Sequence, residues 1–220
     1  MSFDFDTELA TIAAQLGEFS QAGQSYFLST SFQSNSVVLL HLISELDREI
    51  PVYFINTGYH FPETLDFRDA LVHRFSLRLI ELRSEIPKCS QMSRAGRLLF
   101  VESPNYCCYL NKVLPMIPIK SKYDVWISGL RRGQSSHRAN LQKVETDENS
   151  KMKYLPILEW SQEMVDAYVQ QHGLPQHPLH EQGYVSVGCE PCTRPVISHG
   201  QDSRSGRWQG LAKTECGLHL

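Results

Sequence analysis

The chain has 220 residues, 41% of them hydrophobic, which suits one domain with a buried core and excludes disordered and fibrous proteins. Its formal net charge of −3 argues against a non-specific nucleic-acid binder, which is usually basic. No apolar run approaches the roughly 18 residues that span a bilayer, and the first residues, MSFDFDTELA, are acidic where a signal peptide is basic, so we expect a cytoplasmic protein with no membrane or nucleic-acid partner.

Apolar residues at helical spacing predict an N-terminal helix over residues 4–19. Short apolar runs predict buried strands at 26–28, 52–55, 77–82 and 124–128. Between them we expect a helix from Val37 to Leu46 and another from Pro62, because proline suits the first turn of a helix. This alternation predicts an α/β fold, with a mostly parallel sheet and helices on both faces.

In such sheets ligands bind beyond the carboxyl ends of the strands. Three polar segments follow the expected strands there, at residues 29–36, 56–58 and 129–138. From about residue 173 the alternation stops, and Gly, Pro, Cys and charged residues dominate. We therefore expect this stretch to be a functional extension that reaches over the site and is partly mobile.

Two cysteine pairs, Cys107-Cys108 and Cys189-x-x-Cys192, predict a metal centre. Thiols stay reduced in the cytoplasm, and adjacent cysteines lie about 3.8 Å apart at Cα, below the roughly 4.4 Å that ordinary disulfides need. Four thiolates suit either zinc or an iron–sulfur cluster, and their spacing does not choose between these. The alternative for either pair alone is buried apolar cysteine, and for Cys107-Cys108 in isolation this interpretation is favoured.

Cys216, almost at the C-terminus, is the candidate nucleophile. Lys213 and His219 are close enough in sequence to lower its pKa, and the thiolate is the reactive form. A terminal segment can reach a buried substrate first and a protein reductant later. Without a further indication, an inert thiol on a frayed chain end is the simpler interpretation.

A serine-rich loop, STSFQSNS at residues 29–36, and a set of cations predict an anion site. Hydroxyls and N–H groups at a helix N-terminus bind anions, although the loop lacks the glycines and lysine of a Walker A loop and could also be an ordinary cap. Arginine forks bind phosphate and sulfate oxygens. The candidate cations, any one of which alone is more commonly solvated surface charge, are Lys112, Arg131, Arg132, Arg138, Arg204 and Arg207.

Taken together, these segments resemble the iron–sulfur-containing type of the adenylyl-sulfate (APS) and phosphoadenylyl-sulfate (PAPS) reductase family. The resemblance covers about residues 25–220. It is carried by LSTSFQSNSVVLLHL (28–42), NTGYHFPET (56–64), CCYLNKVLP (107–115), SGLRRGQSSHRA (128–139), HPLHEQGYVSVGCEPCTRP (177–195) and GRWQGLAKTECGLH (206–219). The last two segments are the most specific of these.

The resemblance implies a Rossmann-like adenine nucleotide α-hydrolase fold. On this basis we expect a nucleotide-binding α/β reductase domain of residues 1–198, which includes the iron–sulfur site, and a mobile C-terminal tail of residues 199–220, which carries the nucleophilic cysteine. It implies a [4Fe–4S] cluster on Cys107, Cys108, Cys189 and Cys192, and it makes Cys216 the nucleophile. Together with the chemistry above, it gives these substrate-binding residues: Ser29, Ser31, Gln33, Ser36, Thr57, Gly58, Lys112, Arg131, Arg132, Arg204, Arg207 and His219. Cys89 matches no motif, and we interpret it as structural.

The implied reaction reduces adenosine 5′-phosphosulfate to sulfite and AMP, in sulfate assimilation and cysteine biosynthesis. Cys216 attacks the sulfur, AMP leaves, and a thioredoxin thiol releases sulfite from the Cys S-sulfonate. The paired cysteines favour APS as substrate. The loop at 29–36 has no acidic residue to repel a 3′-phosphate, so PAPS, or use of both substrates, is the alternative. The identity of the thiol donor and the formation of a homo-oligomer stay open.

Two other classes share parts of this pattern. A pyrophosphate-loop RNA thiolase would normally carry the loop SGGxDS, but this loop lacks both glycines and the aspartate. A non-enzymatic iron–sulfur sensor would need neither Cys216 nor the arginines. Substitution of Cys216 by serine separates the sensor from the reductase, because only the reductase would lose its activity.

Overall fold

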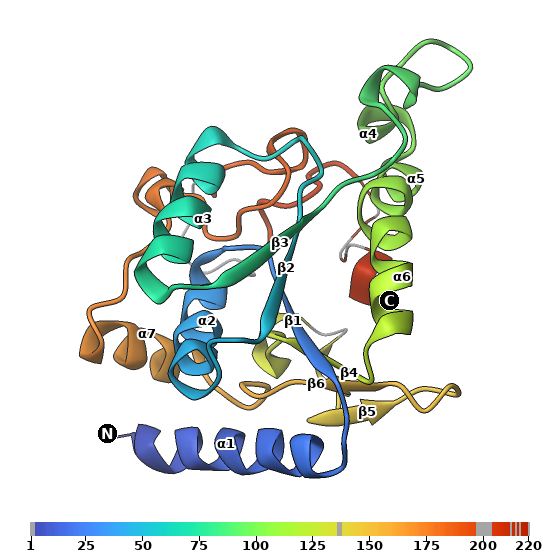
Figure 1. Cartoon of the computed structure of the whole chain (residues 1–220). Coiled ribbons are helices and arrows are strands. Elements are labelled where there is room, and N and C mark those ends of the chain that lie inside the picture. The colour runs from blue at the N-terminus through green and yellow to red at the C-terminus, as the bar shows by residue number, and fades with distance from the viewer. Residues whose placement is uncertain are drawn as a thin grey trace.

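The computed structural model describes residues 3–135, 138–196, 204–211, 213, 215 and 217–219, with only the backbone of Ser34, Asn35 and His219. Six strands in this part of the chain form one sheet in the order β3-β2-β1-β4-β6-β5 (Figure 1). All neighbouring strands are parallel except β5 and β6, which form an antiparallel edge. The strands are β1 Tyr26–Thr30, β2 Pro51–Ile55, β3 Arg78–Leu82, β4 Val125–Ser128, β5 Val144–Thr146 and β6 Met152–Tyr154.

Capping side chains and proline set several helix ends. Asp4 accepts a hydrogen bond from the Thr7 amide at 3.0 Å and starts α1, while Ser161 caps α7 through the Met164 amide at 3.2 Å. The α-helices are α1 Phe5–Gln21, α2 Ser34–Leu46, α3 Pro62–Phe75, α4 Leu99–Glu102, α5 Pro104–Cys108, α6 Leu114–Lys122 and α7 Gln162–Gln171. A π-helical turn, η2 (Tyr109–Val113), joins α5 to α6.

Apolar side chains cover both faces of the sheet because successive strand residues point to opposite sides. Phe27, Tyr53 and Trp126 pack with Met116 of α6 on one face. The alternate positions of these strands join the larger core formed with α1, α2, α3 and α7. That core includes Leu28, Val52, Phe54, Val125 and Ile127. Burial on both faces explains why the strands are continuous apolar runs rather than alternating ones.

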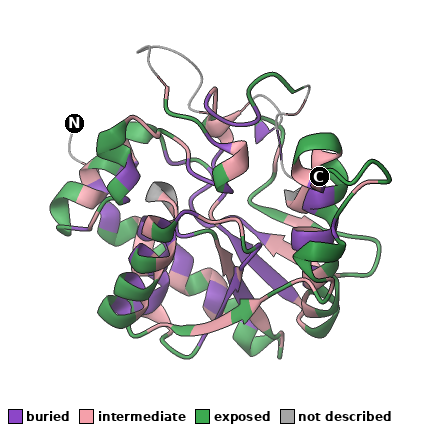
Figure 2. Ribbon diagram, turned by 90° about the horizontal axis from the view of Figure 1, so that it is seen from above, coloured by how far each residue is buried: buried purple, intermediate pink, exposed green. Residues whose placement is uncertain are grey.

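The chain after α7, here called the closing segment (described residues from 173 to 219), has only short 3-10 turns: η5 Pro178–Gln182, η6 Glu190–Cys192 and η7 Gly217–His219. It lies on the carboxyl-end side of the sheet, where Figure 1 draws it in orange to red, and Figure 2 turns the molecule so that this side faces the viewer. Single bridges join His60 to Cys189 and Thr193 to Arg207. Its backbone hydrogen bonds thus go to loops rather than to a continuous ladder.

The predicted α/β architecture is confirmed, as are the N-terminal helix, the helices that contain Val37 and begin at Pro62, and the four strands, within two residues at each strand boundary. The β5–β6 hairpin and the helices α4, α5, α6 and α7 were not expected from the sequence. The proposed division at residue 198 lies outside the described residues and stays a prediction. None of the helices described here is long and apolar enough to cross a bilayer.

Candidate active site

A cavity of about 550 Å³, here called the large cavity, lies at the carboxyl ends of β1 and β4. Its volume falls in the range of pockets that enclose nucleotide-sized ligands. Ser29 and Thr30 from β1, with Ser128 and Gly129 after β4, form part of its lining. The position beyond the strand ends is the one that this type of sheet predicts.

The loop after β1 brings its polar residues to the large cavity by an unusual turn. Phe32 has a φ of +53°, which is rare for a residue with a side chain, and its buried ring packs against Phe54 with centroids 5.5 Å apart. A conformation of this kind is held by its surroundings and is frequent at functional sites. The predicted residues Ser29, Ser31, Gln33 and Ser36 all line the cavity.

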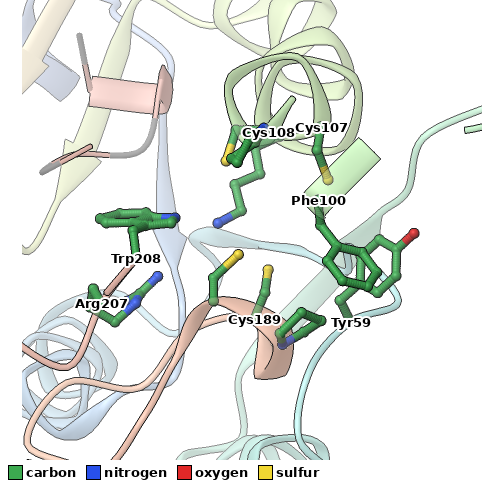
Figure 3. A pocket seen from close by; sticks show the side chains of 11 residues that line it. Tyr59, Phe100, Cys107, Cys108, Cys189, Arg207 and Trp208 are labelled. Carbon is green, nitrogen blue, oxygen red and sulfur yellow. The ribbon is translucent and has the colours of Figure 1, made fainter. Parts of the chain in front are cut away.

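Cys107, Cys108, Cys189 and Cys192 line a second, smaller cavity, here called the sulfur cavity, with Tyr59 and Phe100 (Figure 3). Burial and then the charges of the other three cysteines raise the pKa of Cys107 to about 11. No disulfide links the described cysteines, and Cys89 is exposed on the surface. Within the described residues, no group of three or more His, Cys, Asp or Glu side chains is arranged to hold a single metal ion.

The two cavities share a wall. Lys112, Cys189, Arg207 and Trp208 line both of them. Burial raises the pKa of the Cys189 thiol, but Lys112, the Thr57 hydroxyl and Arg207 outweigh this effect, so that its pKa lies below its ordinary value. Lys112 and Arg207 therefore act electrostatically on a thiol in the wall that the two cavities share.

Lys112 reaches this wall from the π-helical turn η2. Turns of this kind are rare and are often found at functional sites. Arg207 reaches it from the closing segment and donates to the Val187 carbonyl at 3.1 Å. A Cβ atom at position 188 would lie 2.1 Å from Arg207 Nη2, so Gly188 leaves the space that the guanidinium occupies. Arg204 also lines the large cavity, and its guanidinium carbon lies 5.5 Å from the centre of the Trp208 ring.

The second polar segment, residues 56–58, lies at the shared wall rather than in the large cavity. The Thr57 hydroxyl is 3.3 Å from Cys189 Sγ, and Gly58, with a φ of +69°, lies under the Lys88 side chain. His60, which sequence reasoning missed, does line the large cavity. Burial lowers the pKa of His60 to about 4, so its ring is neutral near pH 7.

Arg131 and Arg132 do not line the large cavity. The buried Arg131 donates to the Trp160 carbonyl at 3.1 Å and to Gln162 at 2.7 Å. Arg132 forms an ion pair with Glu159 at 2.5 Å, on a largely exposed surface. These positions give no support to the predicted substrate-binding role of either residue.

Arg138, which the sequence analysis placed among the candidate cations but not among the substrate-binding residues, lines the large cavity. It forms a buried ion pair with Glu215 at 2.9 Å. The two residues are 77 positions apart, so no local pattern could have paired them. The predicted nucleophile Cys216 lies outside the described residues, as does the side chain of His219, and both stay predictions.

Comparison with known proteins finds similar sequences over most of the chain. Residues 25–195 match the family model of the phosphoadenosine phosphosulfate reductase domain. The adenosine 5′-phosphosulfate reductase of Streptomyces coelicolor is 44% identical over 194 residues, which cover 88% of this chain and 81% of that protein. Adenosine 5′-phosphosulfate reductase 1 of Bacillus subtilis is 38% identical over 199 residues, covering 90% and 85%.

Among solved structures, the phosphoadenylyl-sulfate reductase of Candida auris in its phosphate complex is similar, with a TM-score of 0.67. The likeness covers 86% of this chain and 97% of that one at 21% sequence identity. At this identity it shows the shared fold alone.

Proposed function

This chain belongs to the phosphoadenosine phosphosulfate reductase family, and from that premise we propose that it reduces adenosine 5′-phosphosulfate to sulfite and AMP. The relatives from Streptomyces coelicolor and Bacillus subtilis carry the name of that activity. The observation that carries the proposal is the shared wall of the two cavities. It joins a nucleotide-sized cavity rich in hydroxyls and cations to a cavity lined by four thiols.

The large cavity supplies the binding chemistry. The hydroxyls of Ser29, Ser31 and Ser36 can donate hydrogen bonds to phosphate oxygens, as loops at helix N-termini commonly do. Lys112 and Arg207 are cations that can hold the sulfate and the negative charge that develops on the leaving phosphate. The Arg207 Nε atom is buried and has no hydrogen-bond partner among the described residues, which suits an anionic ligand.

Cys216 supplies the nucleophile in this proposal. Its thiolate attacks the sulfur of the sulfate group, the S–O bond to the phosphate breaks, and AMP leaves with the bonding electron pair. A thiolate of a thioredoxin-like protein then attacks the Cys216 sulfur and displaces sulfite. This step leaves a mixed disulfide between the donor and Cys216. The second thiol of the donor resolves that disulfide and restores the Cys216 thiol. Such a donor is kept reduced in the cytoplasm, where we place the reaction.

The four cysteines of the sulfur cavity would hold the [4Fe–4S] cluster. Four sulfur donors in one cavity fit that group by donor chemistry. When bound, the cluster would fix these thiolates and set the local charge beside Lys112.

A second candidate substrate is the 3′-phosphorylated form. The loop at 29–36 contains no carboxylate that would repel an additional phosphate. The names of the sequence relatives favour the unphosphorylated substrate. We therefore expect adenosine 5′-phosphosulfate to be the preferred substrate, with lower activity on the other.

Sulfite release from anaerobically purified protein tests this proposal. We expect thioredoxin-dependent release from adenosine 5′-phosphosulfate, and iron and acid-labile sulfide in the protein. The Cys216→Ser variant should keep the iron and lose the activity by at least about 10³-fold. Equal rates on the two nucleotides would defeat the substrate preference, and no release from either would defeat the assignment as a reductase.

A further inference from the structure

We propose that Glu215 is the positioning residue of the nucleophile, because its carboxylate docks the C-terminal segment onto two arginines of the large cavity. The inference rests on the proposed function, since it concerns the segment that carries Cys216. Glu215 and Gly217 flank Cys216 in the sequence, and both are described. Contacts made on either side of Cys216 therefore constrain how the thiol is presented.

Both oxygens of the Glu215 carboxylate have hydrogen-bond or ion-pair partners. Arg138 donates from Nε to Oε1 at 3.0 Å and from Nη2 to Oε2 at 2.9 Å, which is a bidentate fork. Arg204 Nη2 lies 3.2 Å from Oε2, and the Ser135 hydroxyl donates to Oε1 at 3.0 Å. The residue is only 4% exposed, so this is a buried clamp rather than a surface ion pair.

A carboxylate buried in this way is costly unless it stays charged and paired. Burial raises the pKa of Glu215, but the Arg138 hydrogen bonds and the charges of Arg138 and Arg204 outweigh that effect and lower it. Glu215 is therefore a fixed negative charge at neutral pH. Undocking of the carboxylate would leave the buried Arg138 without its charged partner, so the ion pair favours the docked geometry.

Both partners of Glu215 belong to the large cavity. Arg138 and Arg204 line it, as does Leu218, three residues beyond Glu215. Leu218 also packs against the apolar cluster around Phe27 and Met116. The clamp thus ties the C-terminal segment to the place where the sulfate would bind.

The neighbouring contacts support the same docked position. The short helix η7 packs against the π-helical turn η2, which carries Lys112. On the other side of Glu215, Lys213 donates to the Asn105 side chain in α5 at 2.5 Å. Lys213 Nζ also lies 5.4 Å from the centre of the Trp208 ring. The described residues Lys213, Glu215 and Leu218 thus all contact the α/β part or the large cavity.

Glu215→Gln tests the proposal, because it removes the charge and keeps the size of the side chain. Glu159→Gln is the matched control, since Glu159 also pairs with an arginine, Arg132, but outside the large cavity. Three readouts apply to full-length protein prepared without oxygen: kcat for sulfite release, AMP affinity by calorimetry, and alkylation of Cys216 by iodoacetamide. Alkylation of the exposed Cys89 in the same sample gives the internal reference.

We expect Glu215→Gln to lower kcat at least about tenfold, since small misplacements of a reacting group carry costs of this size. AMP affinity should change by less than about threefold, because AMP does not need the docked segment, and Cys216 should be alkylated at least about fivefold faster relative to Cys89. Glu159→Gln should leave all three at the wild-type values. Arg138→Gln should also speed up the alkylation of Cys216, with no further gain in the double variant.

Wild-type kcat and alkylation in Glu215→Gln would overturn the proposal. So would a general loss, in which AMP affinity falls and Cys89 alkylation changes together with Cys216, because that result indicates a structural role only. Should the wild-type protein release no sulfite, the proposed function fails, while the alkylation comparison still decides whether Glu215 docks the segment.

Discussion

The α/β part of the molecule, residues 5–171, and the closing segment are held by different forces. Core residues of the first part such as Leu40, Phe54 and Ile127 are fully buried. The closing segment adds buried polar contacts to small apolar clusters. Its polar contacts include Thr64 with His177, Thr57 with Cys189 and Arg138 with Glu215, and a small apolar cluster joins Phe61 to Leu179 and Val187. The difference indicates that apolar burial builds the scaffold, whereas buried polar contacts help to join the closing segment to it around the site.

The largest expected effect falls on the junction of the two parts, at Lys112. Because Lys112 lines both cavities, we expect Lys112→Gln to lower kcat/KM for sulfite release by about 10²–10³-fold, the usual cost of one electrostatic donor to a reacting group. Lys122→Gln, at the end of α6, is the matched control and should keep the wild-type value. A loss of less than about threefold in Lys112→Gln would mean that the junction carries no chemistry.

A change in the scaffold should act on stability alone. Leu40 of α2 is fully buried in the main core, and we expect Leu40→Ala to lower the free energy of unfolding by about 2–5 kcal/mol. Leu114→Ala, at an exposed position of α6, should cost less than about 0.5 kcal/mol. Denaturant unfolding measures both values. Equal costs would show that the buried apolar core does not dominate the stability of the α/β part.

The smallest expected effect concerns His177, whose hydrogen bond to Thr64 anchors the closing segment to α3. Its contribution to the free energy of unfolding should depend on pH. The Leu179 amide donates to His177 Nδ1 at 3.3 Å, which leaves Nε2 to donate to Thr64 Oγ1 at 3.0 Å, so the ring is neutral. Burial lowers the pKa of His177 to about 4, although Glu63 opposes this and His180 adds to it. The folded pKa lies below the unfolded value of about 6.5.

The contribution of neutral His177 to stability is therefore fully present above about pH 6.5 and is lost as the pH falls toward 4. The reason is that the histidine of the unfolded chain binds a proton at a higher pH than the histidine of the folded chain. We expect the free energy of unfolding to drop by roughly 1–2 kcal/mol more in wild-type protein than in His177→Gln between pH 7 and pH 4.5, allowing for solvent screening. Other histidines titrate in both proteins and cancel in the difference. Parallel pH curves would contradict the role of this anchor.

The sequence predicted the α/β part well because its apolar runs and helix caps are local signals. The β5–β6 hairpin was not predicted, because each strand has only three residues, too few to show an alternation of apolar and polar side chains. The helix α6, which follows the turn that carries Lys112, was not predicted because Pro115 and Pro118 argue against a helix. The structure nevertheless holds Pro115 in the first turn of α6 and Pro118 inside it. Local propensity was overridden here by packing of Met116 beneath the sheet.

The candidate site was predictable only as a set of residue types. Motifs indicated the four cysteines, which do line one cavity. The pairing of Arg138 with Glu215 and the left-handed turn at Phe32 have no local signal, because the first depends on contacts between distant segments and the second on a residue that rarely adopts this conformation. The basic residues Arg131 and Arg132 show the converse, since their charge suggested an anion site and their contacts are with Trp160 and Glu159.

The central claim is that one thiol, Cys216, captures the sulfonate group while the other four in the motifs are engaged in the sulfur cavity. Intact-mass and peptide analysis after a single turnover with adenosine 5′-phosphosulfate, without any thiol donor, measures this directly. The account predicts one added sulfonate group on the peptide that contains Cys216, removed again by reduced thioredoxin, and no adduct in Cys216→Ser. A sulfonate on Cys89 or on any other side chain, or turnover without an adduct, would contradict it.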